Sequence, residues 1–246
     1  MALLEGRNLR KTYRLGRRNT VEALRGVDIS IEAGEMVAIM GPSGSGKSTL
    51  MHLLGLLHSP DGNHGPAPEV LIDGQSVATL SDRARTQMRA KKMGFVFQSF
   101  NLVPTLTALE NVALAGEYAG VSRGRATAAA REALGWVGLA ERAEHRPMEL
   151  SGGEQQRVAI ARSLVNEPAI VLADEPTGNL DSGHSTEVLE LLRRFNRERG
   201  QTVVLVTHEA ALADALATST LRVEGGLLVR GGAGESAPAG GGSGEP

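Results

Sequence analysis

The chain has 246 residues, of which 41% are hydrophobic, and a formal net charge of −2 at pH 7. This length suits one large domain or a domain with an inserted lobe, and the small acidic excess argues against nucleic acid as a partner, because bulk nucleic-acid binding usually brings a basic surplus. The absence of cysteine excludes disulfides and thiol chemistry and fits a reducing compartment. We find no secretory signal at the start, and no apolar run near the roughly 18–20 residues that span a bilayer. Any membrane role is therefore expected to go through a partner.

The first expected elements are two short alternating runs within residues 2–33, on either side of the polar turn Arg17-Arg18-Asn19. Alternation of apolar and polar residues is typical of a strand with one buried face. We therefore predict an antiparallel β-hairpin in the N-terminal part.

Short apolar runs then alternate with longer helical patterns. The runs are brief and partly β-branched, which favours buried strands. They are Met36–Met40, Gly94–Phe97, Ala169–Ala173 and Thr202–Val206, and the helical patterns are Lys47–Leu57, Glu187–Arg199 and Ala210–Ala217. Strands that alternate with helices predict a largely parallel sheet.

Two further segments differ from this alternation. Residues 106–165 are rich in Ala, Leu, Glu and Arg without a strand-like run, which predicts an inserted helical subdomain. Residues 231–246 are mostly Gly, Ala, Ser, Glu and Pro and have too little apolar surface to offset the entropy of ordering, which predicts a disordered tail. We expect one domain over residues 1–230.

The strongest local motif lies between the first buried strand and the helix after it. Its residues are Gly41-Pro42-Ser43-Gly44-Ser45-Gly46-Lys47-Ser48-Thr49, and their spacing is that of a P-loop. The glycines let backbone N–H groups turn onto phosphate oxygens, Lys47 brings charge to the β- and γ-phosphates, and the Ser48 hydroxyl is suited to Mg²⁺. The alternative is a plain turn that caps a helix, but the strand and helix context favours a phosphate cradle. By itself the motif predicts a nucleoside triphosphate and no particular reaction.

Two acids, Asp174 and Glu175, close a second apolar strand. Ligands of open α/β sheets bind beyond the carboxyl ends of the strands, so Asp174 is expected near Mg²⁺ and Glu175 is suited to deprotonate or orient the attacking water. The alternative is that both acids cap a turn before Pro176. In a chain that already has a P-loop, the pair favours a hydrolytic site.

Polar residues also close two other predicted strands. Gln98 follows Phe95-Val96-Phe97, and His208 follows Val203–Val206 and Thr207. Either residue alone is as well explained by a helix cap or a loop contact. Four strands that each end in a polar residue favour one site, in which Gln98 senses Mg²⁺ or water and His208 meets the γ-phosphate or the water–carboxylate pair.

A second anion-binding turn is expected far along the chain. Ser151-Gly152-Gly153, followed by Glu154, opens a helical pattern, and a helix start with Ser and Gly offers free N–H donors and a hydroxyl. The alternative is an ordinary N-cap. This turn gains significance only in combination with the other motifs.

Together these motifs resemble the ATP-binding subunits of ABC transporters, over nearly the whole chain from about Leu3 to Arg230. The matching residues, in the family's order, are the P-loop, Gln98, Leu150-Ser151-Gly152-Gly153-Glu154-Gln155, Asp174-Glu175, Asn179-Leu180-Asp181 and His208. The resemblance implies an α/β fold with a P-loop (RecA-like) core and a mainly parallel sheet. It also implies an N-terminal antiparallel β subdomain, an inserted α-helical subdomain, and hydrolysis of ATP with Mg²⁺.

The resemblance also implies where each ligand binds. Two subunits would sandwich two ATP molecules head to tail, so that the Ser151–Glu154 turn of one chain closes on the γ-phosphate held by Lys47 of the other. Asp181 would lie at the seam of this homodimer, and Tyr13 would stack on adenine. Ser48, Gln98 and Asp174 would hold Mg²⁺, while Glu175, His208, Gln98 and Lys47 would carry out hydrolysis.

Two longer segments, Phe97–Val112 and Leu172–Asp181, resemble the macrolide-exporter and lipoprotein-release branch. In that branch the ATPase drives integral membrane permease subunits from the cytoplasmic face of the membrane. The segment after Gln98 would receive their coupling helix. Two alternatives remain open: a cell-division ATPase that regulates a cell-wall enzyme through a membrane partner, and an ABC ATPase without a transport role that acts on ribosomes or DNA.

Two features lie outside these assignments. The loop Ser59–Pro68 is a few residues longer than the family's usual turn. His58, just before it, and His64, within it, suggest either a metal or simply solvated side chains. The basic residues between Arg83 and Lys92 suggest either contact with anionic lipid or a partner, or a solvated helix face.

Overall fold

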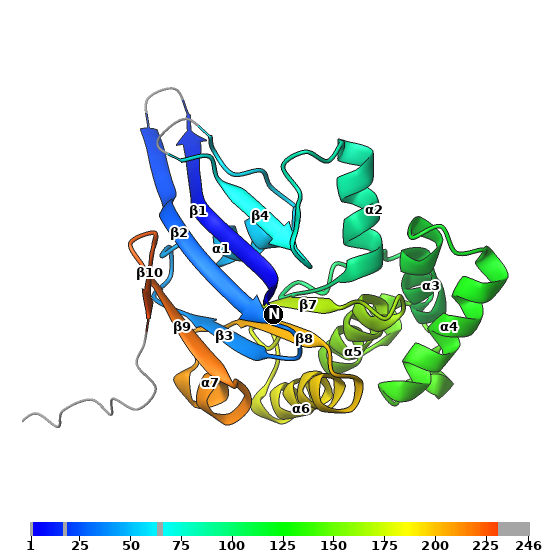
Figure 1. The fold of residues 1–246 in the computed structure, drawn as a ribbon. Coiled ribbons are helices and arrows are strands. Elements are labelled where there is room, and N and C mark those ends of the chain that lie inside the picture. The colour runs from blue at the N-terminus through cyan, green and yellow to red at the C-terminus, as the bar shows by residue number, and fades with distance from the viewer. Residues whose placement is uncertain (1, 17–18, 63–65, 231–246) are drawn as a thin grey trace, which may run out of the picture.

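The computed structural model of the chain describes residues 2–16, 19–62 and 66–230. Arg17 and Arg18 of the predicted turn, His64, and the predicted tail from Gly231 lie outside the described residues. Within them the chain forms two β-sheets, one of six strands and one of four. Figure 1 shows the smaller sheet above the larger one, with a helical lobe at one side.

The six-stranded sheet has the order β10-β9-β3-β8-β7-β6. Its strands are β3 (Met36–Met40), β6 (Met93–Phe97), β7 (Ile170–Asp174), β8 (Thr202–Val206), β9 (Ser219–Glu224) and β10 (Leu227–Arg230). All neighbours pair in parallel except β10, which runs antiparallel to β9 at one edge. The predicted parallel sheet is confirmed, and β9 and β10 extend it beyond the prediction.

The four-stranded sheet is antiparallel, with the order β2-β1-β4-β5. Its strands are β1 (Ala2–Leu15), β2 (Asn19–Glu32), β4 (Glu69–Ile72) and β5 (Gln75–Ser76). The predicted hairpin is confirmed as β1 and β2, each 14 residues long. The sequence analysis missed β4 and β5 because they are only 4 and 2 residues long and offer almost no periodicity.

The parallel strands are buried on both faces, which explains their continuous apolar runs. Along β7, Val171 and Ala173 join one hydrophobic core while Ile170 and Leu172 join the other. Helix α1 (Lys47–Leu54) lies between the two sheets, and helices α5 (Gly152–Leu164) and α6 (Ser182–Arg199) pack on the opposite face. The two cores thereby hold α1 and α5 on opposite sides of the same strands.

The segment between β6 and β7 is helical, as expected for the inserted lobe. It contains α3 (Ala108–Tyr118), α4 (Arg123–Trp136), two 3₁₀ turns (Ala140–Arg142 and Pro147–Glu149) and α5. The other helices are α2 (Asp82–Lys92) and α7 (Ala210–Leu216). Predicted helix ends were less accurate: α1 stops at Leu54, before Gly55, and α6 starts at Ser182 because Asp181 caps it.

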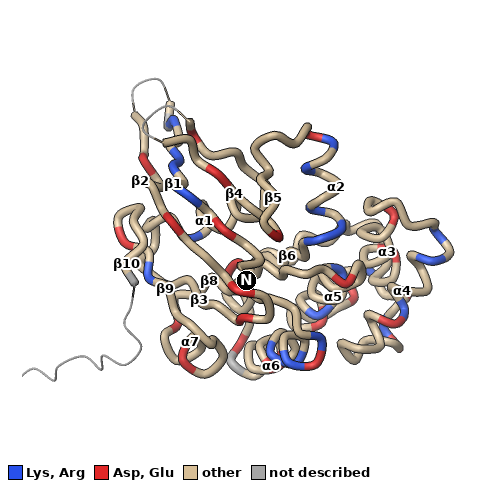
Figure 2. Tube along the Cα trace, viewed as in Figure 1, with Lys and Arg blue, Asp and Glu red and all other residues tan. Residues whose placement is uncertain are grey.

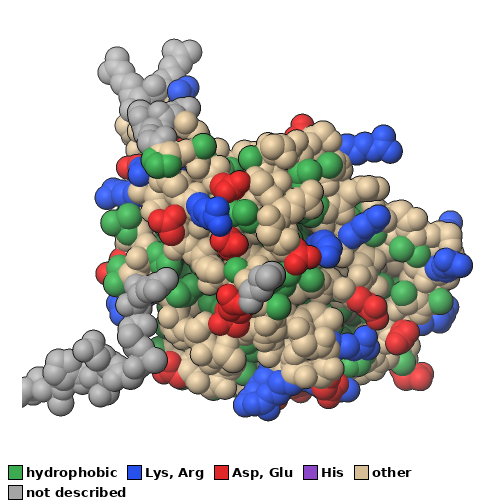
Figure 3. All heavy atoms as spheres, in the orientation of Figure 1, with side chains coloured by type: hydrophobic (Ala, Val, Ile, Leu, Met, Phe, Trp, Pro, Cys, Tyr) green, Lys and Arg blue, Asp and Glu red, His purple; other side chains and the backbone are tan. Residues whose placement is uncertain are grey.

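Charges of both signs are spread over the chain, and basic residues gather along α2 (Figure 2). Two of these basic residues bind the protein itself: Arg89 donates to the carbonyl of Leu56 at 2.9 Å, and Arg85 donates to the carbonyl of Ala78 at 3.4 Å. On the face shown in Figure 3, acidic and basic side chains are interspersed. These observations favour the interpretation of the basic segment as a helix face with structural contacts.

Candidate active site

The P-loop connects β3 to α1 and can be built only with glycine at two positions. Gly41 has φ 148°, and a Cβ atom there would overlap the carbonyl oxygen of Val223 in β9. Gly46 has φ 108°, and a Cβ atom there would overlap the carbonyl oxygen of Ala23 in β2. The loop therefore packs between two strands, in a backbone conformation that residues with side chains rarely adopt.

The loop and the start of α1 carry hydrogen-bond donors that are free to bind an anion. No side chain caps α1, so its first N–H groups lack a side-chain acceptor. The buried hydroxyl of Ser45 has no partner among the described residues. Lys47 is a buried residue, 6% exposed, and its ammonium donates to the carbonyls of Gly41 at 2.9 Å and Pro42 at 3.0 Å. Donors gathered at a helix N-terminus fit phosphate groups.

An oxygen pair lies next to this cradle. The Ser48 hydroxyl donates to Asp174 Oδ1 at 3.1 Å, which joins the start of α1 to the end of β7. Burial raises the pKa of Asp174, and this effect outweighs the opposing influence of Ser48, His52 and Lys47. A hydroxyl and one carboxylate are the ligands that Mg²⁺ uses when phosphates and water supply the others, so the pair fits that ion.

Glu175 follows directly and has an unusual backbone conformation. Its φ is 44°, in the left-handed region, and its amide N–H donates to the carbonyl of Val206 at 2.9 Å. Such a conformation costs about 1–3 kcal/mol in a residue other than glycine and is common at functional sites. Its Oε1 lies 3.3 Å from Nδ1 of His208, so the ends of β7 and β8 are joined at this point.

Gln98 lies at the end of β6 but takes different partners. Its amide nitrogen donates to Asn179 Oδ1 at 3.4 Å, and Asn179 donates back to the Gln98 carbonyl at 3.0 Å. Among the described residues, the hydrogen bonds of Gln98 therefore go to the loop after β7 and not to Ser48 or Asp174. The structure brings Ser48, Asp174, Glu175 and His208 into two bonded pairs and leaves Gln98 in a third.

The Ser151–Glu154 turn forms the N-terminus of α5. Ser151 and Glu154 make a capping box: the Ser151 hydroxyl accepts from the Glu154 N–H at 3.3 Å, and the Glu154 carboxylate accepts from the Ser151 N–H at 2.8 Å. The ring of His184 lies against Gly153, and Asp181 binds His184 through both carboxylate oxygens. Among the described residues, no hydrogen bond or ion pair joins this turn to the P-loop of the same chain.

Comparison with known proteins identifies the family to which this fold and these motifs belong. The family model described as "ABC transporter" matches residues 24–178. The chain belongs to this family. It is an ATP-binding subunit with the ATPase activity characteristic of the family, as the P-loop and the ends of β7 and β8 indicated.

Individual relatives match over most of this chain. The lipoprotein-releasing system ATP-binding protein LolD of Geobacter metallireducens is 48% identical, with 92% of this chain and 98% of the relative covered. The macrolide export ATP-binding/permease protein MacB of Syntrophobacter fumaroxidans is 46% identical over 93% of this chain, which spans only 31% of MacB. The resemblance to the macrolide-export and lipoprotein-release branch is thereby confirmed.

A solved structure of a related cassette also matches the fold. It is the ATP-binding cassette MJ0796, a dimer in a post-hydrolysis state bound to ADP and phosphate. The TM-score is 0.82 at 42% sequence identity, with 92% of this chain and 97% of that chain covered. In the part of this ABC chain that the structure describes, no helix has the length and apolar character that a bilayer crossing requires.

Sequence reasoning missed the residues that shape the segment after Gln98. Phe100 and Asn101 have φ values of 55° and 52°, and both carbonyls accept from the Arg162 guanidinium, at 2.8 and 2.5 Å. Burial lowers the pKa of Arg162. The fully buried Gln156 donates to the carbonyls of Phe97 and Pro176. The segment after Gln98 is thus attached to α5, the same helix that begins at Ser151.

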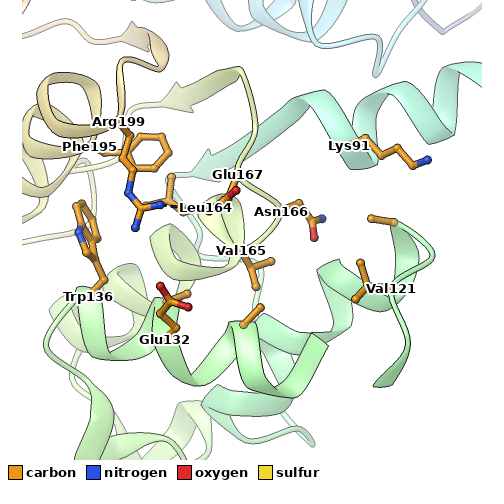
Figure 4. A pocket seen from close by; sticks show the side chains of 13 residues that line it. Lys91, Val121, Glu132, Trp136, Leu164, Val165, Asn166, Glu167, Phe195 and Arg199 are labelled. Carbon is orange, nitrogen blue, oxygen red and sulfur yellow. Dashed lines mark hydrogen bonds and ion pairs between the residues drawn. The ribbon is translucent and has the colours of Figure 1, made fainter. Parts of the chain in front are cut away.

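The lobe and the core also enclose a cavity of about 350 Å³, away from the P-loop. Figure 4 shows its wall, with Trp136 and Phe195 on one side and Lys91 and Val121 on the other. The Trp136 and Phe195 rings meet edge to face at 5.9 Å. The cavity lacks the P-loop and the residues bonded to it, so it is separate from the nucleotide site.

Proposed function

We propose that this ABC ATPase binds Mg-ATP at the P-loop and hydrolyses it between two copies of the chain, and that the resulting motion drives integral membrane permease subunits. The observation that carries this proposal is the pairing of Ser48 with Asp174 and of Glu175 with His208 beside one phosphate cradle. Within the described residues, no hydrogen bond or ion pair joins the turn at Ser151 to that cradle of its own chain. A second copy is the natural source of the missing half.

The chain's own residues supply most of the chemistry at the cradle. Lys47 would neutralise charge on the β- and γ-phosphates. The N–H groups of Ser43, Gly44, Gly46 and Thr49, and the unpartnered hydroxyl of Ser45, would surround the phosphates, with Gly41 at the turn. Ser48, Asp174 and Gln98 would hold Mg²⁺, which supplies Lewis-acid stabilisation of phosphate charge. Tyr13 would stack on the adenine.

Hydrolysis needs a base on the far side of the γ-phosphate. Glu175 accepts the proton of the attacking water on its carboxylate, and the left-handed backbone at this residue sets its direction. His208, bonded to Oε1 of Glu175, holds that carboxylate and the γ-phosphate in line. Gln98 reports the presence of the γ-phosphate through the segment that follows it.

The second copy completes the site. The hydroxyl of Ser151 accepts from Glu154 and can still donate its own proton, so it can bind the partner's γ-phosphate without breaking the capping box. Gly152 and Gly153 offer backbone N–H groups, Glu154 keeps the turn in shape, and Asp181 lies beside it at the expected seam. The dimeric state of MJ0796 with ADP and phosphate supports this arrangement.

We place the ATPase at the cytoplasmic face of the membrane, with its permease partner bound at the segment after Gln98. The names of the relatives, lipoprotein-releasing LolD and the ATP-binding/permease protein MacB, support a membrane partner. Purification from membranes should recover permease subunits. Recovery of ribosomes or DNA instead would contradict this part of the proposal.

The central test is Glu175→Gln. The variant keeps the shape of the side chain but removes the base, so turnover should fall by about 10²-fold or more while ATP still binds. Gel filtration with ATP and Mg²⁺ should then show a stable dimer, which EDTA should dissociate. Glu209→Gln, which changes an acid near His208 that has no role here, serves as the control. Near-normal phosphate release by Glu175→Gln would exclude Glu175 as the base.

A further inference from the structure

Tyr13, the residue proposed to stack on the adenine, is held by a hydrogen bond with a residue for which no such role was predicted from the sequence. Its hydroxyl lies 2.9 Å from Nδ1 of His58, and the two rings meet edge to face with centroids 6.0 Å apart. The Lys11 ammonium lies over the Tyr13 ring, 5.9 Å from its centroid. The phenol ring is therefore oriented before any nucleotide arrives.

His58 is in turn held by the helix that forms the phosphate cradle. Its backbone N–H donates to the carbonyl of His52 in α1 at 3.2 Å, and the two imidazole rings meet edge to face at 5.2 Å. Helix α1 thus fixes the position of the ring that holds Tyr13. Helix α1 thereby links the phosphate cradle at its start to Tyr13 through His52 and His58.

The loop after His58 is fastened to β1 next to Tyr13. Asp61 accepts from the Thr12 N–H at 2.6 Å and from Lys11 Nζ at 3.0 Å, and its own N–H donates to the Arg10 carbonyl at 2.9 Å. Burial alone would raise the pKa of Asp61, but the bonds from Lys11 and Thr12 outweigh it and hold that pKa below its usual value. This is the start of the loop that the sequence analysis found to be longer than usual.

We propose that His58 is a positioning residue for base binding, which holds the Tyr13 ring as a preformed platform. The inference rests on the proposed function, because Tyr13 must be the base contact. A ring that is already ordered does not pay the entropy of ordering when the ligand binds. Stacking on an aromatic ring also tolerates any base. His58 should therefore affect nucleotide affinity and leave the chemical step unchanged.

The test compares three ligands: ATP, GTP and inorganic triphosphate, which has no base. In His58→Ala, the loss of one hydrogen bond should weaken binding of ATP and GTP by a similar factor, up to about tenfold. The affinity for triphosphate and the kcat for ATP should stay the same. His58→Asn, which can place an amide near the Tyr13 hydroxyl, should recover part of the lost affinity.

Tyr13→Phe removes the other end of the same bond and only one oxygen atom, so it carries the test even if His58→Ala fails to fold. It should weaken ATP binding by the same factor, and the double variant should lose no more than either single one. His145→Ala, in the helical lobe, is the matched control and should bind all three ligands normally.

Three results would overturn the positioning role of His58. The first is unchanged ATP binding by His58→Ala, and the second is additive losses in the double variant. The third is a loss confined to ATP, which would indicate direct recognition of adenine by His58. Failure of the unmodified protein to bind ATP or triphosphate at all would instead count against the proposed function.

Discussion

The P-loop and the start of α5 are both helix N-termini suited to anions, but they differ in how their own donors are satisfied. Gly46 precedes α1 without a side-chain cap, whereas Ser151 precedes α5 and forms a complete capping box with Glu154. The open terminus can bind phosphate by itself. The capping box satisfies N–H groups of the other terminus, so that terminus is stable without a phosphate. If the proposed function holds, the P-loop should bind ATP before the turn at Ser151 of a second copy closes on it.

Gly153→Ala is expected to have the largest effect, and it tests whether the start of α5 acts separately from the P-loop. The added methyl would overlap the His184 ring and disturb the start of α5 without touching the P-loop. Overpacking typically costs about 1–3 kcal/mol. Where that cost opposes closure of the turn on the partner's phosphate, turnover should fall by about 10- to 100-fold while one chain still binds ATP normally. Phosphate release and equilibrium ATP binding measure the two quantities.

A second substitution that removes the clash with His184 serves as the control for Gly153→Ala. His184→Ala removes the ring that the methyl would meet, so the double variant should regain turnover relative to Gly153→Ala. If ATP binding falls as much as turnover in Gly153→Ala, the two half-sites are not independent.

A smaller effect is expected where α5 holds the segment after Gln98. Arg162→Met leaves the carbonyls of Phe100 and Asn101 without their donor, and should lower the free energy of unfolding by about 2 kcal/mol in urea titrations. Arg157→Met, on the same helix, removes an ion pair with the exposed Glu187 and a weaker attraction to Glu154, and should cost less than about 1 kcal/mol. Equal losses in the free energy of unfolding for the two variants would mean that the contacts of Arg162 stabilise the fold no more than an ion pair at the surface.

The smallest effect concerns the capping box. The Ser151 N–H, helped by Arg142 at 3.3 Å, holds the pKa of Glu154 below its usual value. A carboxylate with a lowered pKa stabilises the fold above its ordinary pKa of 4.5 and loses that contribution as the pH falls through the lowered value. Glu154→Gln should therefore be less stable by about 1 kcal/mol at pH 7, and the difference should stay constant down to pH 4.5 and shrink only below that value.

Urea titrations at several pH values measure this effect. Glu190→Gln, which removes a solvent-exposed pair with Arg193, should change stability by less than about 0.5 kcal/mol throughout. A difference between Glu154→Gln and the unmodified chain that grows at low pH would contradict the proposed role of the carboxylate.

The four buried strands and the polar residues that follow them could be predicted from local sequence. Strands such as Thr202–Val206 are apolar throughout because both faces are covered, and polar residues can follow only where the chain leaves the sheet. Lys47, Asp174, Glu175 and His208 could therefore be found from local order alone. The short strands β4 and β5 carry too few residues for a periodic signal.

Which of these residues contact one another could be seen only in the folded chain. Hydrogen bonds across more than 30 residues, such as His208 to Glu175, Arg162 to Phe100 and Tyr13 to His58, leave no trace in local periodicity. They depend on how strands order themselves in a sheet and on where a loop is fastened. The same reason explains Gln98, whose place after a strand was predicted but whose partner, Asn179, is set by the packing of two loops.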